Sequence, residues 1–304
     1  MRSIHQPTRP GLAASLSILM FFIPTLGYTS DALSFTPEVG VRYDNNVGLA
    51  PKSADKVEDF VTRVGGKVQY TAFGSPTNKF VLGGGVRYDH FFDLTDLSNL
   101  AVSASALYRG QFGPEPTSVW YSLKGEITGL YFKESEIRDG YKTAITATLG
   151  KRLSDNFAVS AGYQYQLRRS TNDDPEQTPP VNPSWNPDEV FDLDRQGVFT
   201  HLDFMPTTTM TLYGEYSYFT GDVAATGRSF NQGATFTRAR DMAFGPGFIV
   251  WRIDADVHTG RLGIKYKINE QAHLNLYGQY LKALGESDND YEGTVVNASA
   301  NYRF

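Results

Sequence analysis

Cationic side chains recur at alternate positions along this chain, next to apolar neighbours, and they offer its clearest chemistry. Lys124 follows Leu123, for example, and Arg87 follows Val86. A wall lined by one sign of charge concentrates solutes of the opposite sign and sets ion selectivity. The pattern therefore predicts a surface that binds or passes anions. The cations in this register are Arg42, Arg63, Lys67, Lys79, Arg87, Arg109, Lys124, Lys142, Arg152, Arg168, Arg195, Arg261, Lys265, Lys267 and Arg303.

Acidic residues are scarce in the same register, although the whole chain carries a net charge of -5. Six share the register of the fifteen cations: Glu38, Asp59, Asp89, Glu126, Asp203 and Glu215. Most other carboxylates fall in the segments between the alternating stretches. Two interpretations stay open, either an anion-attracting lining or charges that pair across strands and fill the interior.

Histidines could support a different chemistry, the hydrolysis of lipids. That reaction needs a serine, a histidine and an orienting carboxylate or amide at one place. His90 and His258 have aspartates nearby in sequence, but neither belongs to a His-x-Ser pair. The sequence therefore predicts no enzyme, no cofactor and no metal site, and keeps a lipid-modifying enzyme as the less favoured alternative.

Composition removes several other classes. The chain has 304 residues and no cysteine, which excludes disulfide frameworks, thiolate zinc sites and cysteine nucleophiles. Its slight acidity argues against a nucleic-acid partner, which would favour a basic footprint. No apolar run of helix-spanning length follows the first thirty residues, so a helical membrane protein is excluded.

Strands are the elements that must position the cations. A two-residue period with one apolar and one polar face recurs, and no segment shows a convincing helical period. At the C-terminus, Val296 and Ala298 alternate with Asn297 and Ser299. The predicted strands lie near residues 34–44, 58–72, 79–92, 98–111, 118–132, 140–152, 156–169, 190–204, 209–220, 250–267, 272–283 and 291–304.

The connections between these strands alternate in length. Short turns rich in Gly, Pro, Asn and Asp alternate with mostly longer, polar loops, as in outer-membrane barrels. The sequence therefore predicts an all-β, antiparallel up-and-down transmembrane β-barrel of about 12 strands. Ten or fourteen strands stay open, because the stretch from Gly221 to Ile249 could contain a further hairpin with Ser229–Thr237 as one arm.

Aromatic residues on the apolar face form two bands, as expected where rings sit at both membrane interfaces. A secreted β-sandwich or propeller would not show such banding. At the long-loop ends of the strands lie Tyr43, Tyr88, Tyr131, Tyr141, Tyr165, Tyr218 and Tyr280. At the short-turn ends lie Tyr70, Tyr108, Tyr121, Phe157, Phe204, Tyr266, Tyr302 and Phe304.

The N-terminus has the order of a secretory signal peptide. A polar stretch with Arg2 and Arg9 precedes the apolar run Leu12–Leu26, and small residues follow up to Ala32. We expect residues 1–32 to be the signal peptide and residues 33–304 to be the barrel.

Two short stretches carry a resemblance to known families. The terminal Asn301-Tyr302-Arg303-Phe304 is similar to the end of Gram-negative outer-membrane proteins, where such a strand resembles the signal read by the barrel assembly machinery; Tyr302 and Phe304 would carry it. The opening Tyr43-Asp44-Asn45-Asn46-Val47 resembles β-barrel porins and the barrel part of surface lipoprotein assembly modifiers. Some relatives of these families accompany exopolysaccharide export. The assembly modifiers also carry a helical repeat region before the barrel, for which this chain has no room.

This resemblance implies a location in the bacterial outer membrane, with outer-membrane lipids, lipopolysaccharide and the assembly machinery as partners. The favoured function is a porin-like pore that passes or exports polar, anionic solutes, such as acidic oligosaccharides or exopolysaccharide. An anionic glycan would then be a further partner. The alternative is a structural or assembly barrel with a plugged lumen.

Overall fold

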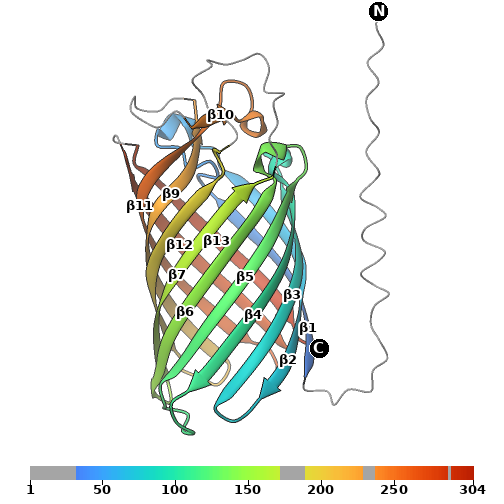
Figure 1. Cartoon of the computed structure of the whole chain (residues 1–304), viewed down its shortest axis with the longest axis vertical. Coiled ribbons are helices and arrows are strands. Elements are labelled where there is room, and N and C mark those ends of the chain that lie inside the picture. The colour runs from blue at the N-terminus through green and yellow to red at the C-terminus, as the bar shows by residue number, and fades with distance from the viewer. Residues whose placement is uncertain (1–31, 172–188, 229–236, 287–288) are drawn as a thin grey trace, which may run out of the picture.

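Twelve antiparallel strands form a closed barrel in the computed structural model, which describes residues 32–171, 189–228, 237–286 and 289–304 (Figure 1). Among these residues, no helix is both long and apolar enough to cross a membrane. The strands are β1 (Leu33–Asp44), β2 (Asp59–Gly74), β3 (Asn78–Phe91), β4 (Asn99–Gln111), β5 (Trp120–Phe132), β6 (Gly140–Ser154), β7 (Phe157–Ser170), β8 (Leu193–Phe204), β9 (Met210–Gly227), β10 (Arg238–Arg240), β11 (Ile249–Lys267), β12 (Ala272–Gly285) and β13 (Tyr291–Tyr302).

Each strand pairs with its neighbour in the chain, and β1 pairs with β13 to close the ring. The three-residue β10 stands outside the ring and pairs with β11 above the point where β12 ends. The predicted all-β, up-and-down barrel of twelve strands is therefore confirmed. Closure removes every free sheet edge, so the backbone groups of the wall are paired as a bilayer requires.

The outside of the wall is apolar and exposed. Val41, Val64, Leu123, Ile145 and Leu276 all face outward with about half of their surface exposed. Side chains at the intervening positions face the interior, because successive residues of a strand point to opposite faces. A closed barrel with an apolar exterior and a polar interior belongs in an outer membrane, which confirms the predicted location.

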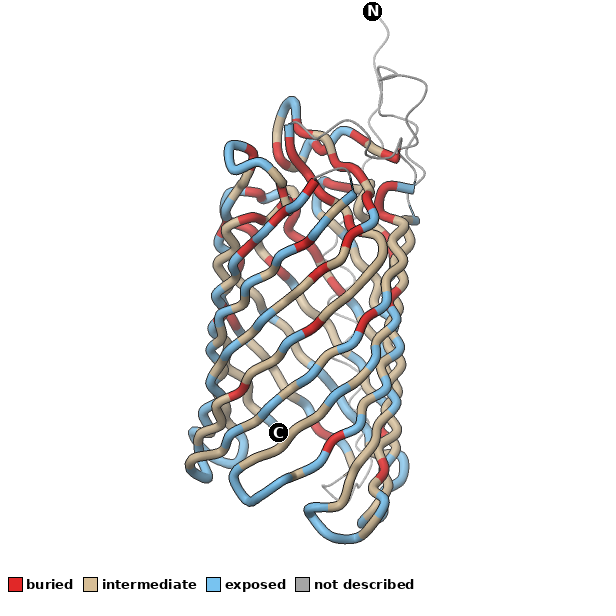
Figure 2. Tube along the Cα trace, turned by 90° about the vertical axis from the view of Figure 1, so that its left-hand side faces the viewer, coloured by how far each residue is buried: buried red, intermediate tan, exposed pale blue. Residues whose placement is uncertain are grey.

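The two ends of the barrel differ. The short turns lie at the lower end in Figure 1, together with the start of β1 and the end of β13, and the longer connections lie at the upper end. Four single-turn 3-10 helices lie in those longer connections: η1 (Ser53–Asp55), η2 (Thr95–Leu97), η3 (Glu136–Arg138) and η4 (Met242–Phe244). Figure 2 shows that buried residues gather at the upper end.

The one strand that departs clearly from its predicted bounds is β9, which continues to Gly227 instead of ending near residue 220. Its added residues Val223 and Ala225 face inward and pack with Trp251 and Ile253 of β11. Packing against β11 thus extends β9 beyond Gly221, where the alternation of apolar and polar residues is interrupted.

Two predicted segments fall largely outside the described residues. The predicted signal peptide, residues 1–32, lies outside them except for Ala32. Of the possible hairpin arm Ser229–Thr237, only Thr237 is described.

Candidate functional site in the barrel lumen

The lumen wall carries the cations that the sequence singles out. The strand register places on the inner face all ten that were expected to matter most: Arg42, Arg63, Lys67, Arg87, Arg109, Lys124, Lys142, Arg168, Arg261 and Lys265. Arg195 of β8 shares this face, opposite Gln166 of β7. Arg303 follows the last residue of β13, so it is not part of the strand wall. The role of the ten in solute passage stays a prediction.

The lower part of one side of the wall is a compact ion-pair network. His201 lies between two carboxylates, with Nε2 3.2 Å from Oδ1 of Asp203 and Nδ1 3.4 Å from Oε2 of Glu215. Arg261 lies 3.3 Å from Glu215, and Lys265 lies 3.5 Å from Asp203. His201, Arg261 and Lys265 share the carboxylates of two residues, so much of the positive charge of this network is offset locally.

Four further cations on the inner wall are paired in the same way. Arg63 forms a two-point contact with Asp89, at 2.8 and 2.9 Å, and Arg87 lies 3.4 Å from the same carboxylate. Two lysines have partners of their own, in the pairs Lys67–Glu38 at 3.5 Å and Lys124–Glu126 at 2.6 Å. Pairing across and along strands, the second of the two sequence-based interpretations, therefore holds for these positions.

A second group of cations has no such partner among the described residues. Within the described ranges, no carboxylate lies at ion-pair distance from Arg42, Arg109, Lys142, Arg168 or Arg195. Aromatic rings take the place of carboxylates at four of them: Phe91 for Arg42, Trp120 for Arg109, Phe191 for Arg168 and Phe219 for Arg195. An aromatic face stabilises a cation without cancelling its charge, so these residues leave the lumen positive.

Solvent reaches the middle of the lumen. The inward-facing side chain of Lys67 is 67% exposed, and that of Arg87 is 43% exposed. Because both point away from the membrane, this exposure is to the interior. Barrels of eight strands are filled by their own side chains, whereas barrels of sixteen enclose a channel. With twelve strands, this barrel is expected to have an interior wider than that of an eight-stranded barrel and narrower than that of a sixteen-stranded one.

The upper mouth is covered by the longer connections. We call their inward-folded parts the cap, which consists of residues 45–58, 92–98, 133–139, 189–192 and 237–248. Phe244 and Phe248 cross to the opposite wall and pack on Val61, Phe91 and Leu97. The cap therefore bridges the walls of β2 and β3 to that of β11, and its apolar side chains are buried at the mouth.

An ion pair joins two connections within the cap. Arg138 of η3 pairs with Asp241, which is 1% exposed and also accepts a hydrogen bond from the Thr226 hydroxyl at 2.8 Å. The Arg138 guanidinium lies 4.5 Å from the centre of the Phe191 ring and 5.7 Å from that of Phe244. One cation thus holds the β5–β6, β7–β8 and β9–β11 connections together.

The opening motif of the chain anchors another part of the cap. The Asn46 amide nitrogen donates to the carbonyls of Ala50 and Glu292, at 3.0 and 2.8 Å, and its oxygen accepts from the Ala50 amide at 2.8 Å. Asn45 accepts from the Thr294 amide at 2.7 Å. These bonds fold the first connection inward and tie it to β13, which explains two asparagines in succession.

Asp59 has a structural role that differs from its expected place among the lumen charges. Its carboxylate accepts hydrogen bonds from the backbone amides of Phe92, Asp93 and Leu94. The residue is 1% exposed. Its hydrogen bonds organise the β3–β4 connection.

The aromatic residues expected in the girdles lie on the outer surface. At the upper end, Tyr43, Tyr165, Tyr218 and Tyr280 donate to carboxylates of Glu58, Asp194, Asp256 and Glu292. The other expected members lie in the same outward register: Tyr88, Tyr131 and Tyr141 above, and Tyr70, Tyr108, Tyr121, Phe157, Phe204 and Tyr266 below. Their role at the membrane interfaces stays a prediction.

The C-terminal residues help to close the ring. The backbones of Phe304 and Phe35 exchange hydrogen bonds of 2.9 and 3.4 Å, and the Tyr302 hydroxyl donates to Gln271. The signal function of Tyr302 and Phe304 in barrel assembly stays a prediction.

The histidines considered for lipid hydrolysis lie on the outer face near the upper end. His90 Nδ1 is 3.4 Å from the Ser98 hydroxyl, but Ser98 is 1% exposed and its oxygen accepts the Phe91 amide. His258 Nδ1 lies 2.7 Å from the Tyr216 hydroxyl. Neither contact presents an open serine nucleophile. No group of three or more His, Asp or Glu in the described ranges could hold a metal ion.

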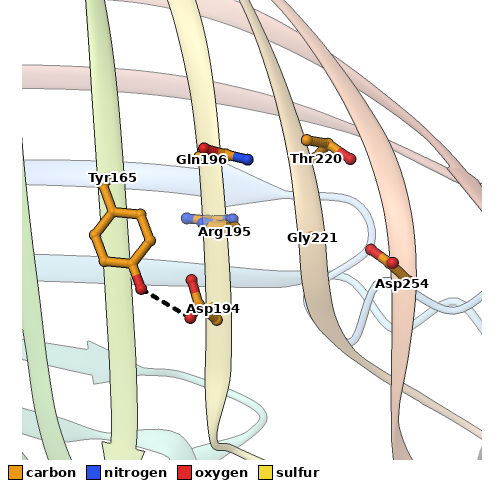
Figure 3. Close-up of a pocket in the computed structure, with 7 residues that line it drawn as sticks. All are labelled: Tyr165, Asp194, Arg195, Gln196, Thr220, Gly221 and Asp254. Carbon is orange, nitrogen blue, oxygen red and sulfur yellow. Dashed lines mark hydrogen bonds between the residues drawn. The ribbon is translucent and has the colours of Figure 1, made fainter.

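A polar recess of about 280 Å³ lies on the outer side near the upper end (Figure 3). Tyr165 donates to Asp194 across it at 2.8 Å, and Asp254 lines its other side. Gly221 also lines it, with a φ of 123°. A Cβ at Gly221 would lie 2.3 Å from the Asp194 carbonyl oxygen, so only glycine lets β9 approach β8 beside Arg195.

Comparisons with solved structures agree with the fold. An outer-membrane channel from Pseudomonas putida F1 is 11% identical, with a TM-score of 0.53, over 89% of this chain and 96% of that one. The KdgM porin in complex with disordered oligogalacturonate is 9% identical over 88% and 99% of the two chains, with a TM-score of 0.44. The outer-membrane phospholipase of Salmonella typhi is 10% identical over 88% and 90%, with a TM-score of 0.43.

No protein-family model matches the chain, and no curated protein matches it in sequence. The likeness to the Pseudomonas channel confirms the predicted resemblance to outer-membrane β-barrels at the level of the fold.

Proposed function

We propose that the protein is an outer-membrane channel that passes or exports anionic solutes, with acidic oligosaccharides or exopolysaccharide as the solutes that fit best. The observation that carries this proposal is the imbalance of charge on the inner wall. Paired cations occupy the lower network, whereas Arg42, Lys142, Arg168 and Arg195 have no carboxylate partner at ion-pair distance in the part of the chain that the structure describes. Their unbalanced charge would raise the concentration of anions in the lumen.

Planar bilayers containing the purified full-length protein test the proposal. Under a KCl gradient, we expect the sign of the reversal potential to show that chloride passes more readily than potassium. This selectivity should decrease as the salt concentration rises, because salt screens the charges of the wall. Clear cation selectivity would contradict the proposed anion pathway.

A second function, a structural barrel without a transport role, is favoured by the cap. Phe244, Phe248 and Phe191 are buried where a solute would have to pass. If the barrel is structural, we expect no conductance steps, either in the natural protein or in a variant whose cap contacts are broken. If it is a channel, we expect steps at least in that variant.

A further inference from the structure

Three cations stand together on the inner wall just below the cap. Lys142 of β6 and Arg168 of β7 are directly opposed in the register, and Arg195 of β8 is opposed to Gln166, two residues before Arg168. Each lies two residues from the upper end of its strand. Like charges placed directly opposite each other on neighbouring strands destabilise a sheet, so this grouping calls for a compensating charge.

Neutral groups hold the two arginines in position. Arg195 directs Nε and Nη2 at the side-chain oxygen of Gln166, at 3.0 and 2.7 Å. Arg168 donates from Nη2 to the Arg138 carbonyl at 2.8 Å, and its guanidinium lies 4.8 Å from the centre of the Phe191 ring. Amide oxygens, carbonyls and rings orient the cations but leave their charges intact.

Nearby carboxylates do not neutralise the group. Glu126 acts on Lys142 only at longer range and is already paired with Lys124 at 2.6 Å. Arg87 and Arg195 add further positive charge around Lys142. Asp192 and Asp139 act on Arg168 electrostatically, but each accepts a backbone amide, of Ser170 and of Phe132. Among the described residues, no carboxylate lies at ion-pair distance from any of the three cations, so their mutual repulsion is only partly offset.

Buried donors without acceptors accompany the cations. Nε of Arg168 is buried and has no hydrogen-bond partner among the described residues. The Tyr291 hydroxyl is likewise unpartnered in a residue that is 3% exposed, and it lies within electrostatic range of Arg195. A buried donor that lacks an acceptor costs free energy, which an acceptor-rich ligand would recover.

We propose that Lys142, Arg168 and Arg195 form a binding subsite for a multivalent oxyanion with carboxylate or phosphate groups. Guanidinium groups match such oxyanions through paired hydrogen bonds, and an ammonium adds a compact charge. The subsite deepens the proposed anion channel and rests on it for the route by which the ligand enters. Its position just below the cap places it near the upper end of the lumen, where a solute that enters from the lower end would arrive after crossing the barrel.

Calorimetric titration of the full-length protein in detergent tests the subsite without requiring conduction. The probes are sodium tripolyphosphate and sodium citrate, which separate phosphate from carboxylate recognition. We expect saturable, salt-sensitive binding of at least one probe, weakened about tenfold by Lys142→Gln and by Arg195→Gln. Arg168→Lys keeps the positive charge but loses the paired N–H donors of the guanidinium. It should therefore weaken binding less than Arg168→Gln.

Lys151→Gln is the matched control, because Lys151 lies on the same strand but in the outward register. It should bind like the natural protein. Heat-modifiable gel migration shows whether each variant is a folded barrel. Absence of saturable binding for both probes, or equal affinity in folded Lys142→Gln, Arg195→Gln and Lys151→Gln, would overturn the subsite. Chloride selectivity without probe binding would reject the subsite alone, whereas binding without conduction would reject the channel alone.

Discussion

The upper and lower parts of the inner wall both hold several cations close together, but they differ in the groups that contact these cations. In the lower part, His201, Arg261 and Lys265 share the carboxylates of Asp203 and Glu215. In the upper part, Arg168 and Arg195 are held by neutral oxygens and rings, and Lys142 lies opposite Arg168. The lower arrangement stabilises the wall by itself, whereas the upper one remains a source of positive potential.

The difference teaches where to look for function in a charged lumen. Counting charges on the inner face treats every lysine and arginine alike. Pairing separates them, because a cation with a carboxylate at 3 Å presents little net field to a passing solute. The cations that have no carboxylate partner among the described residues keep their field, and the proposed function rests on them.

Loosening the cap is expected to have the largest effect. Arg138→Ala leaves the buried carboxylate of Asp241 without its cation, which costs about 3–5 kcal/mol for a buried pair. The connections that Arg138 joins should then separate, and single-channel recordings should show larger or more frequent conductance steps.

The control for the cap is Lys133→Ala, since Lys133 forms an exposed pair with Glu134 at the same end of the barrel. Exposed pairs contribute little, so its conductance should equal that of the natural protein. Unchanged conductance in a folded Arg138→Ala protein would mean that the cap does not control the mouth.

Removing an upper cation is expected to have the next largest effect. At an effective dielectric constant of about 20, a unit charge about 10 Å from an ion is worth about 1–2 kcal/mol before screening. Arg168→Gln should therefore lower the chloride-to-potassium permeability ratio by up to about tenfold, as measured by reversal potentials. A ratio that stays the same would place the selectivity elsewhere on the wall.

Removing a lower acid should shift selectivity in the opposite direction and by less. Glu215→Gln takes one carboxylate from His201 and Arg261, but Asp203 still pairs with His201 and Gln279 still binds Arg261. We expect a modest rise in chloride preference in the same bilayer measurement. A fall in chloride preference would show that Glu215 does not offset positive charge in the lumen of the natural protein.

Local alternation allowed the wall to be predicted well. The two-residue period of a strand assigns each side chain to a face without any knowledge of its partners. The inward positions of Lys142 and Arg261 and the outward positions of Tyr131 and Tyr280 follow from this period. The C-terminal end of β9 was harder to predict, since Val223 and Ala225 extend the strand by packing against Trp251 and Ile253.

The cap could not be predicted from the same patterns. Its connections look polar overall, and scattered apolar residues such as Phe191, Phe244 and Phe248 were a weak local signal that parts of them are buried. Arg138 and Asp241 are 103 residues apart, and no periodicity relates them. The two asparagines of the opening motif were visible in the sequence, but their partners on β13 were not.

The sequence by itself determined the barrel, its strands and the face on which each charge lies, because these depend on neighbours one or two residues away. Only the tertiary structure decided which charges are cancelled. Arg63 meets Asp89 across the β2–β3 register, while Lys142 meets Arg168 across that of β6 and β7. Coulomb interactions depend on the distance between strands brought together by closure, and that distance is not encoded in any local segment.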